Sequence, residues 1–157
     1  DVALAFEPGE KDVINRPPRN PRESIMSRLL IERTFTVGLV ISIGIVYVFM
    51  DAIRDGLSLE RARTISMTTL VFFQFFQAWN SRSEYISIFR ISPFSNPFLL
   101  YSMIGSFLAQ MAVLYIPGLQ WIFRTEPLSL MDWAEIAIVS LSVVLVVEID
   151  KYLRRRK

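Results

Sequence analysis

Long stretches without a charged side chain constrain this fold most. Residues 34–50, 64–80 and 97–116 hold no Asp, Glu, Lys or Arg. Seventeen helical residues reach about 25 Å, close to the roughly 30 Å hydrocarbon core of a bilayer. A fourth stretch, residues 133–149, is apolar except for two glutamates near its ends, where water is close. We therefore predict an all-α membrane protein built on a bundle of four transmembrane helices.

Composition supports the membrane class and removes several kinds of site. Apolar residues make up 52% of the 157-residue sequence, which is high for a soluble domain. The sequence has no cysteine, which excludes a disulfide framework and a thiolate metal site. It has no histidine either, so the commonest metal ligand and the usual pH switch are absent. Most catalytic constellations are excluded on these grounds.

Residues 1–33 differ from the rest of the chain. After a short apolar segment they become polar, with mixed charges and prolines at positions 8, 17, 18 and 21. Prolines at this density prevent one continuous helix. We predict a solvated loop on the membrane surface, with a disordered leader as the alternative, and assign residues 34–157 to the bundle.

The second apolar stretch carries polar side chains along one side. Gln74, Gln77 and Asn80 share an arc about 140° wide with two hydroxyl residues, Ser66 and Thr69. An amide in hydrocarbon needs a hydrogen-bond partner. We expect the three amides to face other helices or a water-filled cavity, and simple interhelical hydrogen bonds are an equally good explanation for Gln74 and Gln77.

Small residues and cap residues mark where helices approach and begin. Gly38 and Gly44 contribute to a small-residue face in the first stretch, a spacing that permits close helix packing but is common by chance. Asn96 followed by Pro97 predicts the start of the third helix. Asp132 can cap the fourth helix, and a loop is expected between the third and fourth helices.

Basic residues are unevenly distributed among the connecting segments. Residues 1–33 hold six Lys and Arg, residues 81–97 hold two and residues 150–157 hold five. The alternate segments, residues 51–63 and 117–131, hold three and one. By the positive-inside rule both termini are cytoplasmic, which requires an even number of spans. The basic residues 154–157 are then expected to anchor the chain at the inner leaflet, with lipid as a partner and no role for nucleic acid.

Four sequence motifs lead to a known family. They run in family order at family spacing: ALAFEPGEKDVINRPPRNPRESI (3–25), TTLVFFQFFQAWNSRSE (68–84), SIFRISPFSNPFLL (87–100) and YIPGLQWIFRTEPLSLMDW (115–133). With these motifs the chain resembles the C-terminal part of P-type cation-transporting ATPases, in the calcium-pump-like branch. The resemblance implies the end of the sixth membrane helix and a cytoplasmic coupling loop in residues 1–33, followed by helices seven to ten.

The resemblance also implies what this chain lacks. The phosphorylated aspartate, the nucleotide-binding domain and the main cation-ligating carboxylates of the family lie in parts that this sequence does not contain. The chain therefore cannot hydrolyse ATP alone and needs no cofactor of its own. ATP and Mg²⁺ are implied only for the complete pump, in which the N-terminal catalytic and transport portion would be the partner of this chain.

Two functional elements follow from the resemblance. Pro17, Pro18, Arg19, Asn20 and Pro21 match the family's coupling loop, where fixed φ angles suit a mechanical relay.

The other element is Gln74, which stands where pumps of the sarcoplasmic-reticulum type have a cation-ligating glutamate. An amide holds a hard divalent cation more weakly than a carboxylate does. The transported cation is therefore Ca²⁺ or another ion such as Na⁺.

A different class of function competes with the pump. No charged residue lies in the middle of any predicted span, whereas ion pathways usually contain one. This absence favours a four-span membrane scaffold or accessory subunit without transport chemistry. A small self-contained channel is less well supported, because only the second stretch has a polar face.

Overall fold

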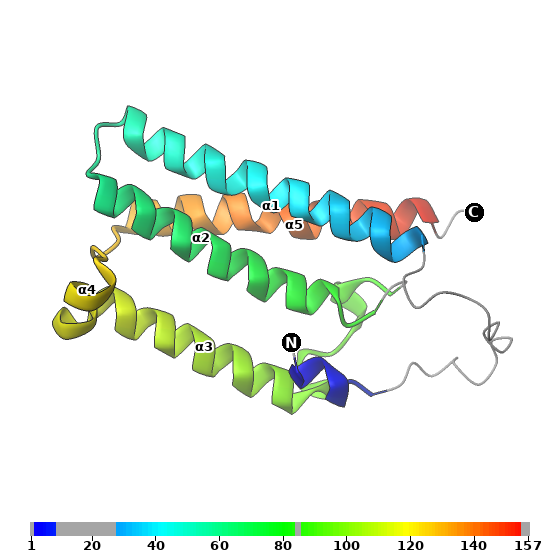
Figure 1. The fold of residues 1–157 in the computed structure, drawn as a ribbon. Helices are drawn as coiled ribbons and strands as arrows, with labels where there is room; N and C mark the ends of the chain where they lie inside the picture. Colours follow the sequence, from blue (N-terminus) through cyan, green and yellow to red (C-terminus); the bar gives the residue numbers. More distant parts are fainter. Residues whose placement is uncertain (1, 9–27, 84–85, 155–157) are drawn as a thin grey trace, which may run out of the picture.

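A computed structural model describes residues 2–8, 28–83 and 86–154. All the regular elements over these residues are helices, which confirms the predicted all-α class (Figure 1). The proline-rich residues predicted to form the coupling loop, including Pro17 to Pro21, lie outside these ranges. The elements are η1 (Val2–Phe6), α1 (Arg28–Arg54), α2 (Leu59–Asn80), η3 (Ile88–Arg90), η4 (Pro93–Ser95), α3 (Pro97–Tyr115), α4 (Pro117–Phe123) and α5 (Leu130–Arg154).

Helices α1, α2 and α5 pack against one another as a three-helix bundle, and α3 lies alongside α2 (Figure 1). The four long helices alternate in direction. As a result, the start of α1, the end of α2, the start of α3 and the end of α5 lie at one end of the molecule. The main packing partners of α3 are α4, η1 and η4 rather than the bundle.

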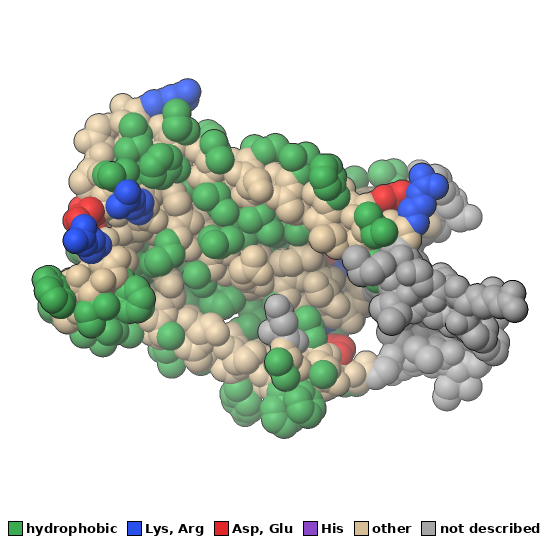
Figure 2. Space-filling view, in the orientation of Figure 1, with side chains coloured by type: hydrophobic (Ala, Val, Ile, Leu, Met, Phe, Trp, Pro, Cys, Tyr) green, Lys and Arg blue, Asp and Glu red, His purple; other side chains and the backbone are tan. Residues whose placement is uncertain are grey.

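Two apolar clusters fill the bundle. One lies toward the α1–α2 turn and the other toward the opposite end; they consist of Val48, Ala52, Ala62, Ile65, Leu114, Leu128 and Ile136, and of Val37, Phe73, Val143, Val144 and Val147. Many large apolar side chains point outward instead, such as Phe35, Tyr101 and Ile138, each at least 70% exposed. Figure 2 shows charged side chains gathered near the two ends of this face and apolar ones along its length. A surface of this kind fits a lipid environment.

Three of the helices, α1, α3 and α5, are long and apolar enough to cross a membrane. Helix α2 is 22 residues long but does not meet the same criterion. Its charged first turns, with Glu60, Arg61 and Arg63, and its glutamines lower its overall hydropathy. Its buried face carries further polar side chains, including Thr64, Thr68, Thr69 and Asn80. Enclosure between α1 and α5 makes these polar groups tolerable, because they face protein rather than lipid.

Helix starts follow local rules, with one correction. Asn96 caps α3 as predicted, accepting a hydrogen bond from the Leu99 N–H at 2.9 Å. Asp132 lies within the first turn of α5 and pairs with Ser129. The Ser129 N–H donates to Asp132 at 2.7 Å, and the Asp132 N–H donates to the Ser129 hydroxyl at 3.3 Å. This reciprocal arrangement is a capping box that starts the helix at Leu130, three residues before the predicted boundary.

The predicted loop after α3 is wrong in its first half, where α4 forms. Pro117 occupies the first helical turn, a position in which its fixed φ and missing N–H cost nothing. Helix α4 ends at Arg124, whose φ of 51° is left-handed and whose N–H bonds back to the Gln120 carbonyl. The side-chain amide of Gln120 donates to the Leu114 carbonyl at 2.6 Å, which folds α4 against the end of α3.

Gly44 lies where α1 packs closely against Phe73 of α2 and Val139 of α5, and replacing it with alanine tests this packing. A Cβ at Gly44 would lie 2.6 Å from Cζ of the fully buried Phe73 and 3.2 Å from Cγ1 of Val139. We expect Gly44→Ala to destabilise the fold by about 1–3 kcal/mol through overpacking. The measurement is the thermal unfolding midpoint in detergent.

Gly38→Ala is the matched control on the same helix, because a Cβ there meets nothing within 4 Å. Its expected effect is neutral or stabilising by up to about 1 kcal/mol, from helix propensity. Equal midpoints for the two variants would contradict the close approach of α1 to α2.

Candidate functional site: the polar wall of helix α2

The hydroxyl groups on the buried side of α2 are satisfied within the helix. Thr64, Thr68 and Thr69 each donate to the backbone carbonyl four residues earlier at 2.8 Å. Ser66 does the same at 2.9 Å. These groups therefore need no partner from another helix. Thr68 nevertheless accepts a hydrogen bond at 3.0 Å from the buried amide of Gln110, which links α3 to α2.

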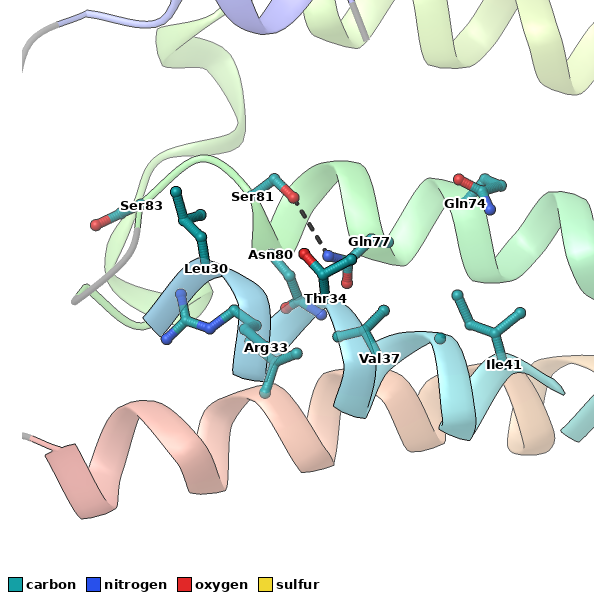
Figure 3. Close-up of a pocket in the computed structure, with 12 residues that line it drawn as sticks. Leu30, Arg33, Thr34, Val37, Ile41, Gln74, Gln77, Asn80, Ser81 and Ser83 are labelled. Atoms are coloured by element: carbon teal, nitrogen blue, oxygen red, sulfur yellow. Dashed lines mark hydrogen bonds between the residues drawn. The ribbon is translucent and has the colours of Figure 1, made fainter. Parts of the chain in front are cut away.

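The three predicted amides lie together on one wall of a pocket between α1 and α2 (Figure 3). The pocket has a volume of about 390 Å³. Gln74 is exposed, Gln77 is half-buried and Asn80 is only 2% exposed. The α1 side of the pocket is lined by Leu30, Arg33, Thr34, Val37, Gly38 and Ile41, and the remainder by Ser81, Ser83 and Val147.

The amides of Gln77 and Asn80 are incompletely bonded. Gln77 Nε2 donates to Ser81 Oγ at 3.4 Å, and Asn80 Nδ2 donates to the Val143 carbonyl at 3.5 Å. Both contacts are long. Gln77 Oε1 and Asn80 Oδ1 are buried and have no hydrogen-bond partner within the described part of the chain. A buried acceptor without a partner is costly, so these oxygens are suited to a donor or a cation that approaches from outside the described residues.

The pocket offers neutral oxygens rather than carboxylates. Asp150, on the neighbouring stretch of α5, is engaged by Arg33 at 2.8 Å and by Arg154 at 2.7 Å. Nowhere in residues 2–8, 28–83 and 86–154 do three acidic side chains come close enough to hold a metal ion. Neutral oxygens alone hold hard divalent cations weakly.

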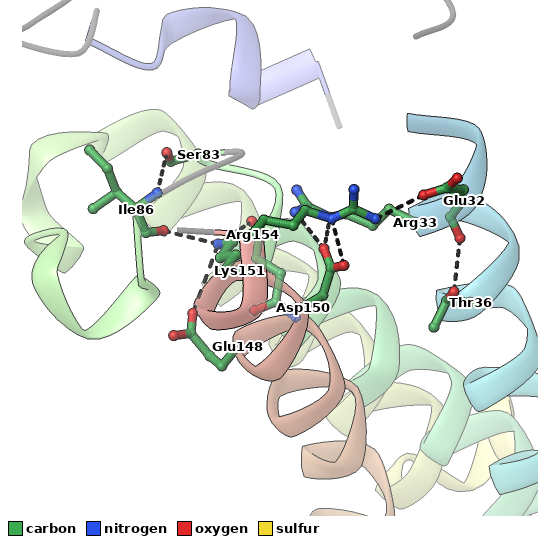
Figure 4. Close-up of polar contacts among 10 residues, drawn as sticks. Glu32, Arg33, Thr36, Ser83, Ile86, Glu148, Asp150, Lys151 and Arg154 are labelled. Atoms are coloured by element: carbon green, nitrogen blue, oxygen red, sulfur yellow. Dashed lines mark hydrogen bonds and ion pairs between the residues drawn. The ribbon is translucent and has the colours of Figure 1, made fainter. Parts of the chain in front are cut away.

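Lys151 is a structural residue that the sequence did not reveal. It is 2% exposed, and its ammonium donates to the carbonyls of Asn80 at 3.1 Å and Ile86 at 3.0 Å (Figure 4). Glu148 lies 3.9 Å from that ammonium and accepts a hydrogen bond at 3.0 Å from the Ile88 N–H. A cation at the carboxyl end of a helix satisfies its last carbonyls and its dipole. Lys151 thereby fixes the end of α2 that carries the three amides Gln74, Gln77 and Asn80, here called the amide wall.

Arg154 lies in a charge network rather than apart from the protein. It pairs with Asp150 at 2.7 Å and with Glu32 at 3.0 Å, which joins α5 to α1. Part of the predicted inner-leaflet anchor is therefore engaged within the bundle, and residues 155–157 lie outside the described ranges. The sequence signal for either role was two acidic residues followed by basic residues at the end of the fourth apolar stretch, in residues 148–157.

Substitution of Lys151 by methionine tests its role at the end of α2. Removing the ammonium leaves two carbonyls without this donor, so we expect a loss of about 1–3 kcal/mol in the free energy of unfolding. Arg154→Met is the control, with an expected loss of about 0–1 kcal/mol because its ion pairs are partly exposed. Thermal unfolding midpoints compare the two, and a larger loss for Arg154→Met would contradict the assignment.

Comparison with known proteins covers almost the whole chain. The family model described as "Cation transporting ATPase, C-terminus" matches residues 1–153. Calcium-transporting ATPase type 2C member 1 of Homo sapiens is 38% identical over 155 residues, which are 99% of this chain and 17% of that protein. Type 2C member 2 of Mus musculus is 38% identical over 160 residues, with the same two shares.

A fungal relative is similar to the same extent. Calcium-transporting ATPase 1 of Yarrowia lipolytica is 36% identical over 150 residues, 96% of this chain and 16% of that protein. The chain thus spans 16–17% of the length of these relatives. The family match over nearly every residue confirms the resemblance seen in the motifs, and the chain belongs to the C-terminal family of cation-transporting ATPases.

Proposed function

We propose that this chain is the C-terminal membrane region of an ATP-driven calcium transporter. The single observation that carries the proposal is the polar helix α2, held between two apolar helices, with buried and unsatisfied amide oxygens beside the pocket. The names of the three relatives, all calcium-transporting ATPases, support calcium as the cation. In this proposal phosphorylation, ATP and Mg²⁺ belong to the N-terminal portion of the pump.

The proposed arrangement in the bilayer has four spans and both termini in the cytoplasm. Three apolar helices support it, as does the alternation of α2 with them. The basic side chains of the end where α1 starts include Arg28, Arg33, Arg82, Arg90, Lys151 and Arg154, against Arg54, Arg61, Arg63 and Arg124 near the other end. The positive-inside rule assigns the first set to the cytoplasm.

The proposed work of the bundle is to support the transport helices and to couple them to the phosphorylation domain. The acceptors on Gln77 and Asn80 would receive donors from the transport helices, which removes the cost of leaving them unpaired. Residues 1–33, with the prolines 17, 18 and 21, would carry movement between the membrane and the cytoplasmic domains. Fixed φ angles would make that connection stiff.

Gln74 is the proposed contribution of this chain to the cation path. It is the exposed member of the amide wall, and the structure gives it no hydrogen bond within the described residues. Its carbonyl oxygen can ligate a cation without contributing charge. The cation is Ca²⁺ or another ion held mainly by carboxylates elsewhere in the pump.

Reconstitution of this chain with the N-terminal portion tests the proposal. ATP hydrolysis is measured with Ca²⁺, Mg²⁺, Mn²⁺, Na⁺ and K⁺ for the wild type and for Gln74→Ala. We expect stimulation by Ca²⁺ and a rise of up to about tenfold in its half-saturation for the variant, equivalent to about 1.4 kcal/mol. Gln74→Glu should lower the half-saturation for a divalent cation, because it adds a charge.

Gln110→Ala is the matched control, since it removes an amide that is buried and bonded to Thr68. It should lower the thermal unfolding midpoint while leaving the half-saturation unchanged. If no cation stimulates hydrolysis, the pump proposal fails and the scaffold or accessory-subunit alternative, favoured by a pocket without carboxylates, takes its place. Stimulation with an unchanged half-saturation in Gln74→Ala would remove Gln74 from the path.

A further inference from the structure

Arg82, two residues beyond α2, is almost completely enclosed, with 2% of its side chain exposed. Its guanidinium donates to both carboxylate oxygens of Glu7, with the shortest contact from Nη2 at 2.7 Å and contacts from Nε at 3.0 and 3.1 Å. It also donates to the Ser92 carbonyl at 3.0 Å and to the Ser95 hydroxyl at 2.5 Å. One side chain therefore joins the segment after η1, the end of α2 and the connector before α3.

Asn96 completes the enclosure of the same carboxylate. Its Nδ2 donates to Glu7 Oε2 at 2.9 Å and to the Ala3 carbonyl at 3.0 Å, while its Oδ1 caps α3. Asn96 is 1% exposed. Beside it, the rings of Phe6 and Phe98 stack with centroids 4.4 Å apart. Residues 2–8 are thus held by an apolar and a polar contact at the start of α3.

The groups around Glu7 stabilise the charged form of its carboxylate. Burial tends to raise the pKa of the carboxyl, but hydrogen bonds from Arg82 and Asn96 and the charge of Arg82 outweigh it, so the pKa lies below the ordinary value of 4.5. The carboxylate is therefore ionised at neutral pH. A two-pronged contact between guanidinium and carboxylate fixes direction as well as distance, which a lysine would not do.

The contact of Glu7 with Arg82 and Asn96 joins three parts of the chain. Glu7 belongs to ALAFEP, Arg82 to NSRSE and Asn96 to SPFSNP, three of the motifs that carry the family resemblance. The main packing of η1 is with α3, and α3 in turn packs mainly with α4, η1 and η4. Arg82 therefore links this unit to the end of α2 at the position where the chain enters residues 9–27. Trp79, in the last turn of α2, adds a second link through its Nε1–H contact with Met103 Sδ at 2.7 Å.

We propose that Arg82 and Asn96 form a clamp for the Glu7 carboxylate, which positions the entry to the coupling loop on the ends of α2 and α3. The proposal rests on the proposed function and specifies how the loop is attached to the bundle. With the clamp closed, movement at the loop is transmitted to the bundle. With the clamp open, ATP hydrolysis continues but moves fewer cations per turnover.

The test is a double-mutant cycle in the reconstituted pump, made of this chain joined to the N-terminal portion and inserted in lipid vesicles. The variants are Glu7→Gln, Arg82→Met and the double variant, and the readout is Ca²⁺ taken up per ATP hydrolysed. We expect each single variant to lower this ratio at least threefold and the double variant to lower it no further, because the two residues act as one unit. The half-saturation for Ca²⁺ should stay within twofold of wild type.

Arg154→Met is the matched control, since Arg154 forms ion pairs with Asp150 and Glu32 at the same end of the bundle, does not line the pocket and does not contact Glu7. It should lower the thermal unfolding midpoint slightly and leave the transport ratio unchanged. If Arg82→Met does not fold, the transport ratio of the nearly isosteric Glu7→Gln is compared with that of Arg154→Met instead.

The outcomes separate the two proposals. An unchanged ratio in Glu7→Gln and Arg82→Met, or losses that add in the double variant, would overturn the clamp while leaving a working pump. A lowered ratio in Arg154→Met as well would also overturn it, because the effect would then reflect general destabilisation. A wild-type protein without cation-stimulated hydrolysis would overturn both the clamp and the proposed function.

Discussion

The enclosure of α2 by α1 and α5 is the constraint on which the rest of the structure depends. Helix α2 carries more polar side chains than lipid would tolerate, and its buried threonine hydroxyls are satisfied by its own backbone carbonyls. The close packing of α1 and α5 against α2 keeps the buried polar side chains, such as Thr64, Thr68 and Asn80, away from lipid. Gly44 makes the approach possible, because any larger residue would meet the buried ring of Phe73. The enclosure of the polar helix α2 therefore depends on the glycine of α1 that faces it.

The charged side chains lie near the two ends of the helices, where they join the helix ends and connecting segments to one another. At one end, Arg61 and Asp132 tie the start of α2 to the start of α5 at 2.7 Å. At the other end, Lys151 closes the last turn of α2 and Arg82 gathers the connector and the segment after η1. Lys151 and Arg82 are almost completely enclosed, so several carbonyl and carboxylate acceptors offset their desolvation cost.

The functional interpretation depends on the polar groups that line the pocket between α1 and α2. Its amide oxygens are oriented and unsatisfied, but no carboxylate stands among them. A bundle with such a wall is suited to complete a site that other helices supply, and to hold those helices in place. The family assignment agrees with this interpretation, because this chain corresponds to a small C-terminal part of much longer relatives.

The sequence by itself determined the local features. Three charge-free stretches and a fourth with two glutamates near its ends indicated the four long helices. Asn96 and Pro97 located the start of α3, and contiguous motifs identified the family. Each of these depends on neighbouring residues, whose hydrogen bonds and periodicity can be followed along the chain. Whether α2 spans the bilayer stays a prediction, because charged residues in its first turns and glutamines further along lower its hydropathy.

Tertiary structure decided the partners of the charged and polar side chains. Lys151 donates a hydrogen bond to the Asn80 carbonyl although the two residues are 71 positions apart in the sequence, and Arg82 and Glu7 are 75 positions apart. Nothing in the composition of a short segment specifies such a pair, because any of several carboxylates would satisfy an isolated arginine. Helix α4 also escaped prediction, since Pro and Gly are ordinary loop residues until a neighbouring helix supports them. Packing chooses among chemically equivalent partners, and that choice exists only in the folded bundle.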